Sequence, residues 1–149
     1  MNIKVVDVEV LSRHHSLYQQ GIEKISNTKK DFLERLEPFK VQMHKMITES
    51  IKITDETIIK ENAAKFEDLQ EKAVQIDNEF KAKMREMNDE LSKEIYTNLE
   101  AIINEWSVAN SVDMVVSSTE VIYLNPKHFV TDEIIEILKE KELYINLEE

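Results

Sequence analysis

The apolar residues in the central part of the chain recur at the spacing of an α-helix. A stripe of apolar side chains runs from Ile59 to Trp106 with a mean step of about 3.6 residues, the period of a straight helix rather than the 3.5 of a strict coiled coil. A less regular stripe from Ile22 to Ile51 precedes it and contains Pro38, where we expect a helix to bend or a new helix to begin. The central part of the chain is therefore predicted to be helical.

A polar segment separates the two stripes. Within residues 52–58, Thr54 and Asp55 are residue types that cap the start of a helix, and an acidic side chain follows where the helix dipole favours it. We therefore predict a long antiparallel helical hairpin over residues 17–106 with its tip near residues 52–58. The alternative, one continuous helix of about 90 residues, is far longer than the helices of ordinary globular proteins.

The two ends of the chain have a different pattern. Alternation of β-branched and acidic residues predicts a strand over residues 2–9. Two runs rich in Val and Ile, residues 112–116 and 121–124, predict a β-hairpin. Thr131 is then expected to cap a short C-terminal helix.

These elements predict an α+β fold that is predominantly α, with the helical hairpin projecting from a small β-rich body formed by residues 1–16 and 107–149. Three short strands and one helix cannot bury a large core, and open sheet edges carry unpaired backbone groups. Association of copies into a symmetric ring would remove these edges. We expect seven apolar residues of the strands and of the last helix to lie between copies: Val6, Val8, Val115, Val116, Val121, Ile122 and Ile134.

Composition narrows the function further. The chain has one Gly, two Pro and no Cys, which excludes Gly-rich phosphate loops and thiolate metal sites. Its net charge of −11 argues against a nucleic-acid binder, which needs a basic surface. No segment approaches the roughly 18 consecutive apolar residues of a membrane span, and the N-terminus lacks the pattern of a secretory signal. As written, the chain is expected in the cytoplasm; if a signal peptide has been removed, it is expected in the periplasm.

Charge divides unevenly between the two predicted arms of the hairpin. Residues 11–53 have a net charge of +3, whereas residues 54–111 have a net charge of −7. Folded back on each other, the arms would be electrostatically complementary. Exposed ion pairs contribute only about 0–1 kcal/mol each, so this complementarity would orient the arms more than stabilise them.

The residue types that carry catalysis or bind metals occur without a supporting pattern. His14 and His15 are adjacent, and adjacent side chains on a helix point about 100° apart, so they do not form a paired metal-binding face. Acidic neighbours such as Asp89 and Glu90 are typical of a solvated helix face. We therefore predict no metal site, no cofactor and no enzymatic activity.

Methionines and isoleucines suggest a binding surface along the hairpin. Flexible, polarizable Met side chains suit a surface that accepts many apolar partners. The residues that we expect to contact such partners are Met43, Met46, Ile47, Ile51, Met84 and Met87. Ordinary packing between the two arms is the alternative explanation for the methionines.

Several segments resemble the OmpH/Skp family of periplasmic chaperones. The resemblance lies in the opening Ile-Lys-Val-Val-Asp-Val at residues 3–8, the charged hairpin, the Val-Asp-Met-Val-Val run at 112–116, the Val-Ile-Tyr strand and the Val-Thr-x-x-Ile-Ile motif at 130–135. It covers nearly the whole chain, which would be an unusually acidic member without a signal segment. The resemblance implies a homotrimer with a β-barrel body and helical arms around a cavity that holds unfolded outer-membrane proteins without ATP.

The leading functional hypothesis is therefore an ATP-independent holdase chaperone that binds unfolded client proteins between the helical arms of a homotrimer. The alternative is a structural coiled-coil scaffold or spacer whose arms pack permanently against partner helices. A closed trimer favours the chaperone, whereas assembly that grows with concentration favours the scaffold.

Overall fold

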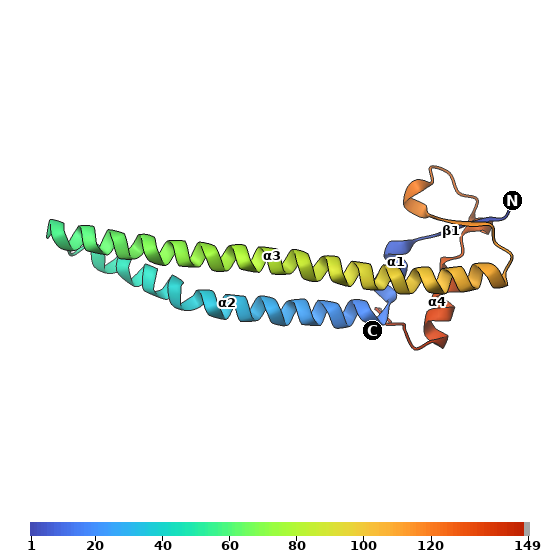
Figure 1. The fold of residues 1–149 in the computed structure, drawn as a ribbon, viewed down its shortest axis with the longest axis horizontal. Coiled ribbons are helices and arrows are strands. Elements are labelled where there is room, and N and C mark those ends of the chain that lie inside the picture. Colours follow the sequence, from blue (N-terminus) through green and yellow to red (C-terminus); the bar gives the residue numbers. More distant parts are fainter. Residues whose placement is uncertain (148–149) are drawn as a thin grey trace. The chain divides into compact units, whose positions relative to one another are not determined.

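The computed structural model describes residues 1–147, and the chain divides into two compact units. Unit 2 is the continuous segment Lys24–Met87, and unit 1 combines Met1–Glu23 with Asn88–Glu149. The two longest elements are the helices α2 (Ser16–Ser50) and α3 (Glu56–Ala109), and each contributes residues to both units (Figure 1). The predominantly α fold with a small β part is confirmed.

In unit 2, α2 and α3 lie side by side and antiparallel (Figure 1). The rings of Phe32 and Phe80 are 5.4 Å apart, and Arg35 Nη2 lies 3.1 Å from Glu79 Oε2, so residues later in α2 face residues earlier in α3. Both aromatic residues belong to the apolar stripes of the sequence. The predicted helical hairpin is therefore present.

The tip of the hairpin lies where the sequence predicts it. α2 ends at Ser50 and α3 begins at Glu56. Asp55 Oδ1 accepts hydrogen bonds from the backbone N–H groups of Thr57 at 2.9 Å and Ile58 at 3.3 Å, so Asp55 caps the start of α3. One continuous helix through residues 52–58 is thereby excluded.

Pro38 does not begin a new helix, because α2 continues through it. A proline inside a helix removes one backbone hydrogen bond and leaves the carbonyl four residues earlier without its donor. Here Pro38 lies on the exposed face of α2, where water can satisfy that carbonyl. Of the two possibilities for Pro38, a bend within one helix or the start of a new helix, the continuous α2 excludes the second.

Unit 1 contains a two-stranded parallel sheet rather than the predicted hairpin. β1 (Ile3–Val6) pairs with β2 (Met114–Ser117) in parallel, with Ile3 opposite Met114. Residues 121–124 form no strand, although the backbone of Val121 is extended. β2 thus pairs with the beginning of the chain instead of with the next run of apolar residues, and the predicted β-hairpin is wrong.

The first strand is also shorter than predicted, because a helix begins inside residues 2–9. The Asp7 side chain accepts a hydrogen bond from Val10 N–H and caps α1 (Val8–His14), which places Val8 on a helix. Each described strand is four residues long. The described part of unit 1 is therefore mainly helical, because it includes the end of α3, and its β part is small.

The last helix, α4 (Thr131–Glu140), follows two short 3-10 turns at Ser118–Glu120 and Pro126–His128. Thr131 is not its cap: Val130 holds that position and makes no side-chain cap bond. The Thr131 Oγ1 atom instead accepts a hydrogen bond from Asp7 N–H at 2.9 Å and joins the start of α4 to the start of α1.

The core of unit 1 gathers residues from both ends of the sequence. Three of its members, Ile95, Leu99 and Ile102, come from the predicted apolar stripe. The complete buried cluster comprises Val6, Leu11, Ile95, Leu99, Ile102, Val130, Ile134 and Leu138.

The segment after α4 holds the junction between α1 and α2. Ser16 N–H donates to Leu143 O at 2.9 Å, Ile145 N–H donates to His14 O at 2.7 Å, and the His14 ring stacks on Tyr144. The adjacent His15 is fully buried. Its Nδ1 accepts from Leu17 N–H at 3.1 Å, so the proton is on Nε2, which donates to Asn98 Oδ1 at 2.6 Å.

The single glycine of the chain marks a close helix contact inside unit 1. A Cβ atom at Gly21 would overlap the side chain of Leu91, approaching its Cγ to 2.9 Å. Glycine inside a helix is about 1 kcal/mol less favourable than alanine, so this close approach explains its presence.

We expect Gly21→Ala to destabilise the protein despite its better helix propensity, because Leu91 must move. Gly21→Ala combined with Leu91→Ala should be more stable than the two single changes predict, since the overlap is gone. Thermal unfolding of the four proteins measures this coupling. Strictly additive effects would show that the contact does not constrain residue 21.

Candidate functional site

The tip of the hairpin has an apolar groove. It is lined from α2, the turn and α3 by Met46, Ile47, Ser50, Ile53, Ile59, Asn62, Ala63 and Phe66. Ile47 is 54% exposed and Ile59 is 46% exposed. We call this surface of unit 2 the tip groove.

Two more large apolar side chains, close in sequence to the residues that line the groove, are exposed. Ile51, in the turn after α2, is 83% exposed, and Ile58, in the first turn of α3, is 43% exposed. Apolar side chains at such exposure are not held by packing within the chain. Their concentration at one end of a helical hairpin is typical of a surface that binds another molecule.

The structure separates the six residues predicted to contact partners. Met46 and Ile47 line the tip groove, and Ile51 is exposed in the turn beside them. Met43 and Met84 are half-buried and do not line the groove. Met87 is buried, with 7% of its surface exposed, so it belongs to the interior and its prediction as a contact residue is corrected.

Sequence reasoning missed four residues of this apolar surface: Ile53, Ile58, Ile59 and Phe66. Two of them, Ile59 and Phe66, are members of the apolar stripe, which served only to predict the helix. The stripe remains partly uncovered near the turn, since Ile59 is 46% exposed and Phe66 is half-buried. One signal in the sequence could have identified these residues. Asp55 was one of the two residues expected to cap the second helix, and its position determines which residues lie next to the turn.

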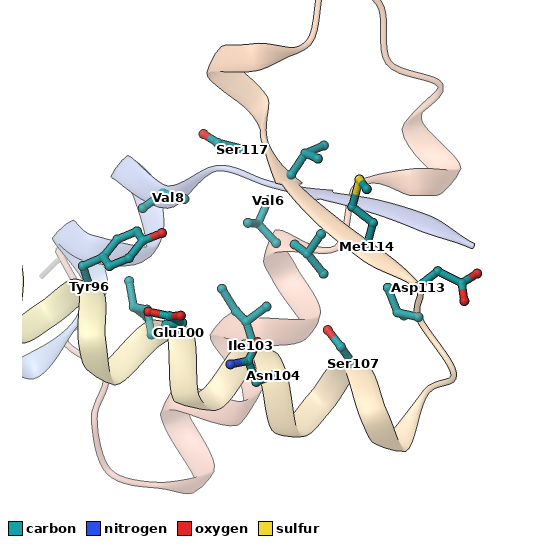
Figure 2. Close-up of a pocket in the computed structure, with 14 residues that line it drawn as sticks. Val6, Val8, Tyr96, Glu100, Ile103, Asn104, Ser107, Asp113, Met114 and Ser117 are labelled. Carbon is teal, nitrogen blue, oxygen red and sulfur yellow. The ribbon is translucent and has the colours of Figure 1, made fainter. Parts of the chain in front are cut away.

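Unit 1 has a second groove, between α3 and β2, which we call the body groove (Figure 2). Tyr96, Glu100, Asn104 and Ser107 lie on its α3 side at helical spacing, and Figure 2 shows Ser107 pointing from α3 toward β2. Its other lining residues are mostly apolar and are Val6, Val8, Leu99, Ile103 and residues 112–117.

Two polar groups in the body groove, on Ser107 and Glu100, lack partners within residues 1–147. Ser107 Oγ is buried without a hydrogen bond, and the Glu100 carboxylate makes no ion pair there. The edge of β2 that faces away from β1 also has no strand partner in this part of the chain. A buried polar atom without a partner is costly, so the groove is suited to be covered by a segment that brings donors.

A third surface of unit 1 is the exposed loop at residues 121–127. Ile122 is fully exposed and Tyr123 is 81% exposed. Tyr123 and its neighbours Val121 and Leu124 line a hollow with Ile3 and Val5 of β1. We call residues 121–127 the body loop.

These surfaces divide the residues predicted to lie between copies. Val8, Val115 and Val116 line the body groove, and Val121 and Ile122 belong to the body loop. Val6 and Ile134 differ, since the chain's own residues bury them to 2% and 0% exposure. These two side chains belong to the core of a single chain, and their assignment to a contact surface is corrected.

The net charge differs more between the two units than between the two arms of the hairpin. Unit 2 contains 13 basic and 13 acidic residues, so the whole net charge of −11 belongs to unit 1. Among the ion pairs within residues 1–147, only Arg35–Glu79 joins α2 to α3. The expected complementarity of the arms thus reduces to one exposed pair between them.

Residues 1–147 were searched for clusters of metal ligands and for helices that could cross a membrane. In this range no three His, Cys, Asp or Glu side chains come close enough together to hold a metal ion. None of the helices described there combines the length and the hydropathy that crossing a bilayer requires.

Comparisons with known proteins agree on the fold. The family model of OmpH-like outer membrane proteins matches residues 2–138. A crystal structure of a candidate outer membrane chaperone (OmpH-like) from Caulobacter crescentus CB15 has a TM-score of 0.76 and 9% sequence identity, and the match covers 98% of this chain and 88% of that chain. No curated protein shows significant similarity to the sequence.

Proposed function

Since the chain belongs to the family of OmpH-like outer membrane proteins, a family of chaperones, we propose that it is an ATP-independent holdase. It binds unfolded client proteins and prevents their aggregation. The observation that carries this proposal is the tip groove with Ile47 and Ile51 exposed beside it. Contacts of this kind are individually weak, and several of them together retain a client.

The tip of the hairpin suits clients of varied sequence. Met46 adapts its shape to different apolar side chains, and the groove contains few polar groups that would demand a specific partner. Unit 2 has no net charge, so it neither attracts nor repels a client by its overall sign. By family resemblance, the clients are unfolded outer-membrane proteins.

We further propose that the chaperone is a homotrimer assembled through unit 1, with clients held between the hairpins of the three copies. The unpaired edge of β2 and the apolar residues of the body groove and body loop support association. Family membership favours the periplasm over the cytoplasm as the compartment.

The proposal predicts suppression of aggregation at stoichiometric amounts. An outer-membrane protein diluted from urea into buffer without ATP should stay soluble when one trimer per client is present, as followed by light scattering. Aggregation at the rate of the client alone would contradict the holdase. Light scattering of the protein without client should give one closed trimeric mass, whereas a mass that grows with concentration would favour the scaffold.

A further inference from the structure

The tip groove contains two polar side chains, Ser50 and Asn62, among apolar ones. The Ser50 hydroxyl donates a hydrogen bond to Ile47 O at 2.7 Å, within its own helix. The Asn62 side chain is half-buried and makes no hydrogen bond within residues 1–147. Asn62 therefore gives the groove an unpaired amide, which offers a hydrogen-bond donor and an acceptor together.

The fold of α3 does not account for an asparagine at position 62. Asparagine is less favourable than alanine inside a helix, because its side chain competes for backbone groups. Asp55 already caps the start of α3, and Asn62 lies in the second turn, beyond the reach of a cap. Ile59 and Phe66 lie three and four residues away on the same helix face, so the amide is set between apolar side chains of the groove.

A side-chain amide matches the main chain of an extended polypeptide. In an extended segment the N–H and C=O groups of one residue point to the same side, so a single amide can accept from the first and donate to the second. In a helix or a sheet these groups are already paired. The amide therefore distinguishes unpaired main chain from folded main chain, whatever the side chains of the ligand.

We propose that Asn62 makes the tip groove selective for extended client segments whose main-chain groups are unpaired. Asn62 Oδ1 accepts from the N–H of one client residue and Nδ2 donates to its C=O, while neighbouring client side chains are buried against Met46, Ile59 and Phe66. This inference rests on the proposed holdase and names the conformation of the chain that it retains. The occupant is a segment of an unfolded protein, because helices and sheets use both main-chain groups themselves.

A helical segment is bound less tightly than an extended one of the same apolar content. It would cover the Asn62 amide without supplying a partner, and the amide would lose its hydrogen bonds to water. The apolar side chains of the groove accept many client sequences, and Asn62 adds a selection for client conformation.

Two peptides of identical sequence test the role of the Asn62 amide. The first is a fluorescently labelled decapeptide in which leucine alternates with serine, and the second is the same peptide N-methylated at every residue, which removes the main-chain donors. The wild type should prefer the unmethylated peptide. Asn62→Leu, which is close to asparagine in size, should lower this preference about fivefold or more, because the amide is gone. Fluorescence anisotropy measures the four dissociation constants.

Asn78→Leu is the matched control, since Asn78 is exposed on α3 in the same unit and does not line the groove. It should keep the preference of the wild type. If residue 62 contributed only apolar contact area, Asn62→Leu would change the affinity for both peptides equally. A preference unchanged by Asn62→Leu, in a variant that circular dichroism shows to be helical, therefore overturns the inference.

A crosslinked helical peptide with the same number of leucines tests the selection of conformation. The wild type should bind it less tightly than the unmethylated decapeptide, and Asn62→Leu should reduce this difference, since no amide is left to be covered. The same difference in the wild type and in Asn62→Leu would contradict the selection.

The outcomes separate this inference from the holdase on which it rests. If the combined change of Ile47 and Ile51 to Ser abolishes binding of the decapeptide but Asn62→Leu keeps the full preference, the selection by Asn62 is wrong and the holdase remains. A wild type that suppresses client aggregation without preferring the unmethylated peptide has the same meaning. If the wild type neither binds the peptides nor suppresses aggregation, the two proposals fail together.

Discussion

Replacing Ile47 and Ile51 together with Ser is expected to weaken client binding about 100-fold or more. Both side chains are more than half exposed beside the tip groove, so they are free to be covered by a client. Burial of one large aliphatic side chain contributes about 1.5–3 kcal/mol, and the two losses add within each arm. Several arms holding one client would multiply the loss further.

This substitution leaves the net charge unchanged and removes only apolar surface, which makes the cause of any change clear. The matched control replaces Val41 and Val74 with Ser. These two side chains are 57% and 52% exposed in the same unit but do not line the groove. Client aggregation should proceed with the tip variant and be suppressed by the control. Equal activity of the two variants would show that clients bind elsewhere, and circular dichroism establishes that both remain helical.

Ile134→Asp is expected to unfold unit 1 rather than to dissociate folded copies. Ile134 is fully buried among core residues of its own chain, so an aspartate there would be a buried charge without a partner. Changes of this kind are among the few that cost more than about 4–5 kcal/mol, a large part of the total stability of a domain.

Ile122→Asp provides the comparison, because the same change is made at a fully exposed position. It should leave the thermal unfolding of the isolated subunit unchanged and weaken only the association of copies. Thermal unfolding and mass are measured together for both variants. A well-folded monomer from Ile134→Asp would mean that Ile134 faces another copy, as its position in the sequence pattern first indicated.

The helical hairpin could be predicted because its signals are local. The apolar stripe from Ile59 to Trp106 repeats over many turns, and Asp55 caps the helix within the segment that was expected to form the tip. The pairing of strands could not be predicted in the same way. β2 pairs with β1, more than a hundred residues earlier, and no pattern near residues 112–116 indicates that partner.

Competing local signals account for two other differences. Val6 and Val8 alternate with acidic residues as in a strand, but the Asp7 side chain caps a helix at that point, and the helix prevails. Met87 and Met46 have the same residue type and both occur within helical stripes. One is buried and the other lines the tip groove, a distinction that depends on the distance from the turn rather than on the residue.

Unit 2 is built from one segment of the chain and unit 1 from two, and this difference affects the order in which a newly made chain can fold. Unit 2 is one continuous segment, so it can form its hairpin as soon as residues 24–87 have left the ribosome. Unit 1 must wait, because β1 needs β2 and the backbone of His14 needs Ile145. The hairpin with its tip groove can thus form during synthesis, before the strands of unit 1 are able to pair.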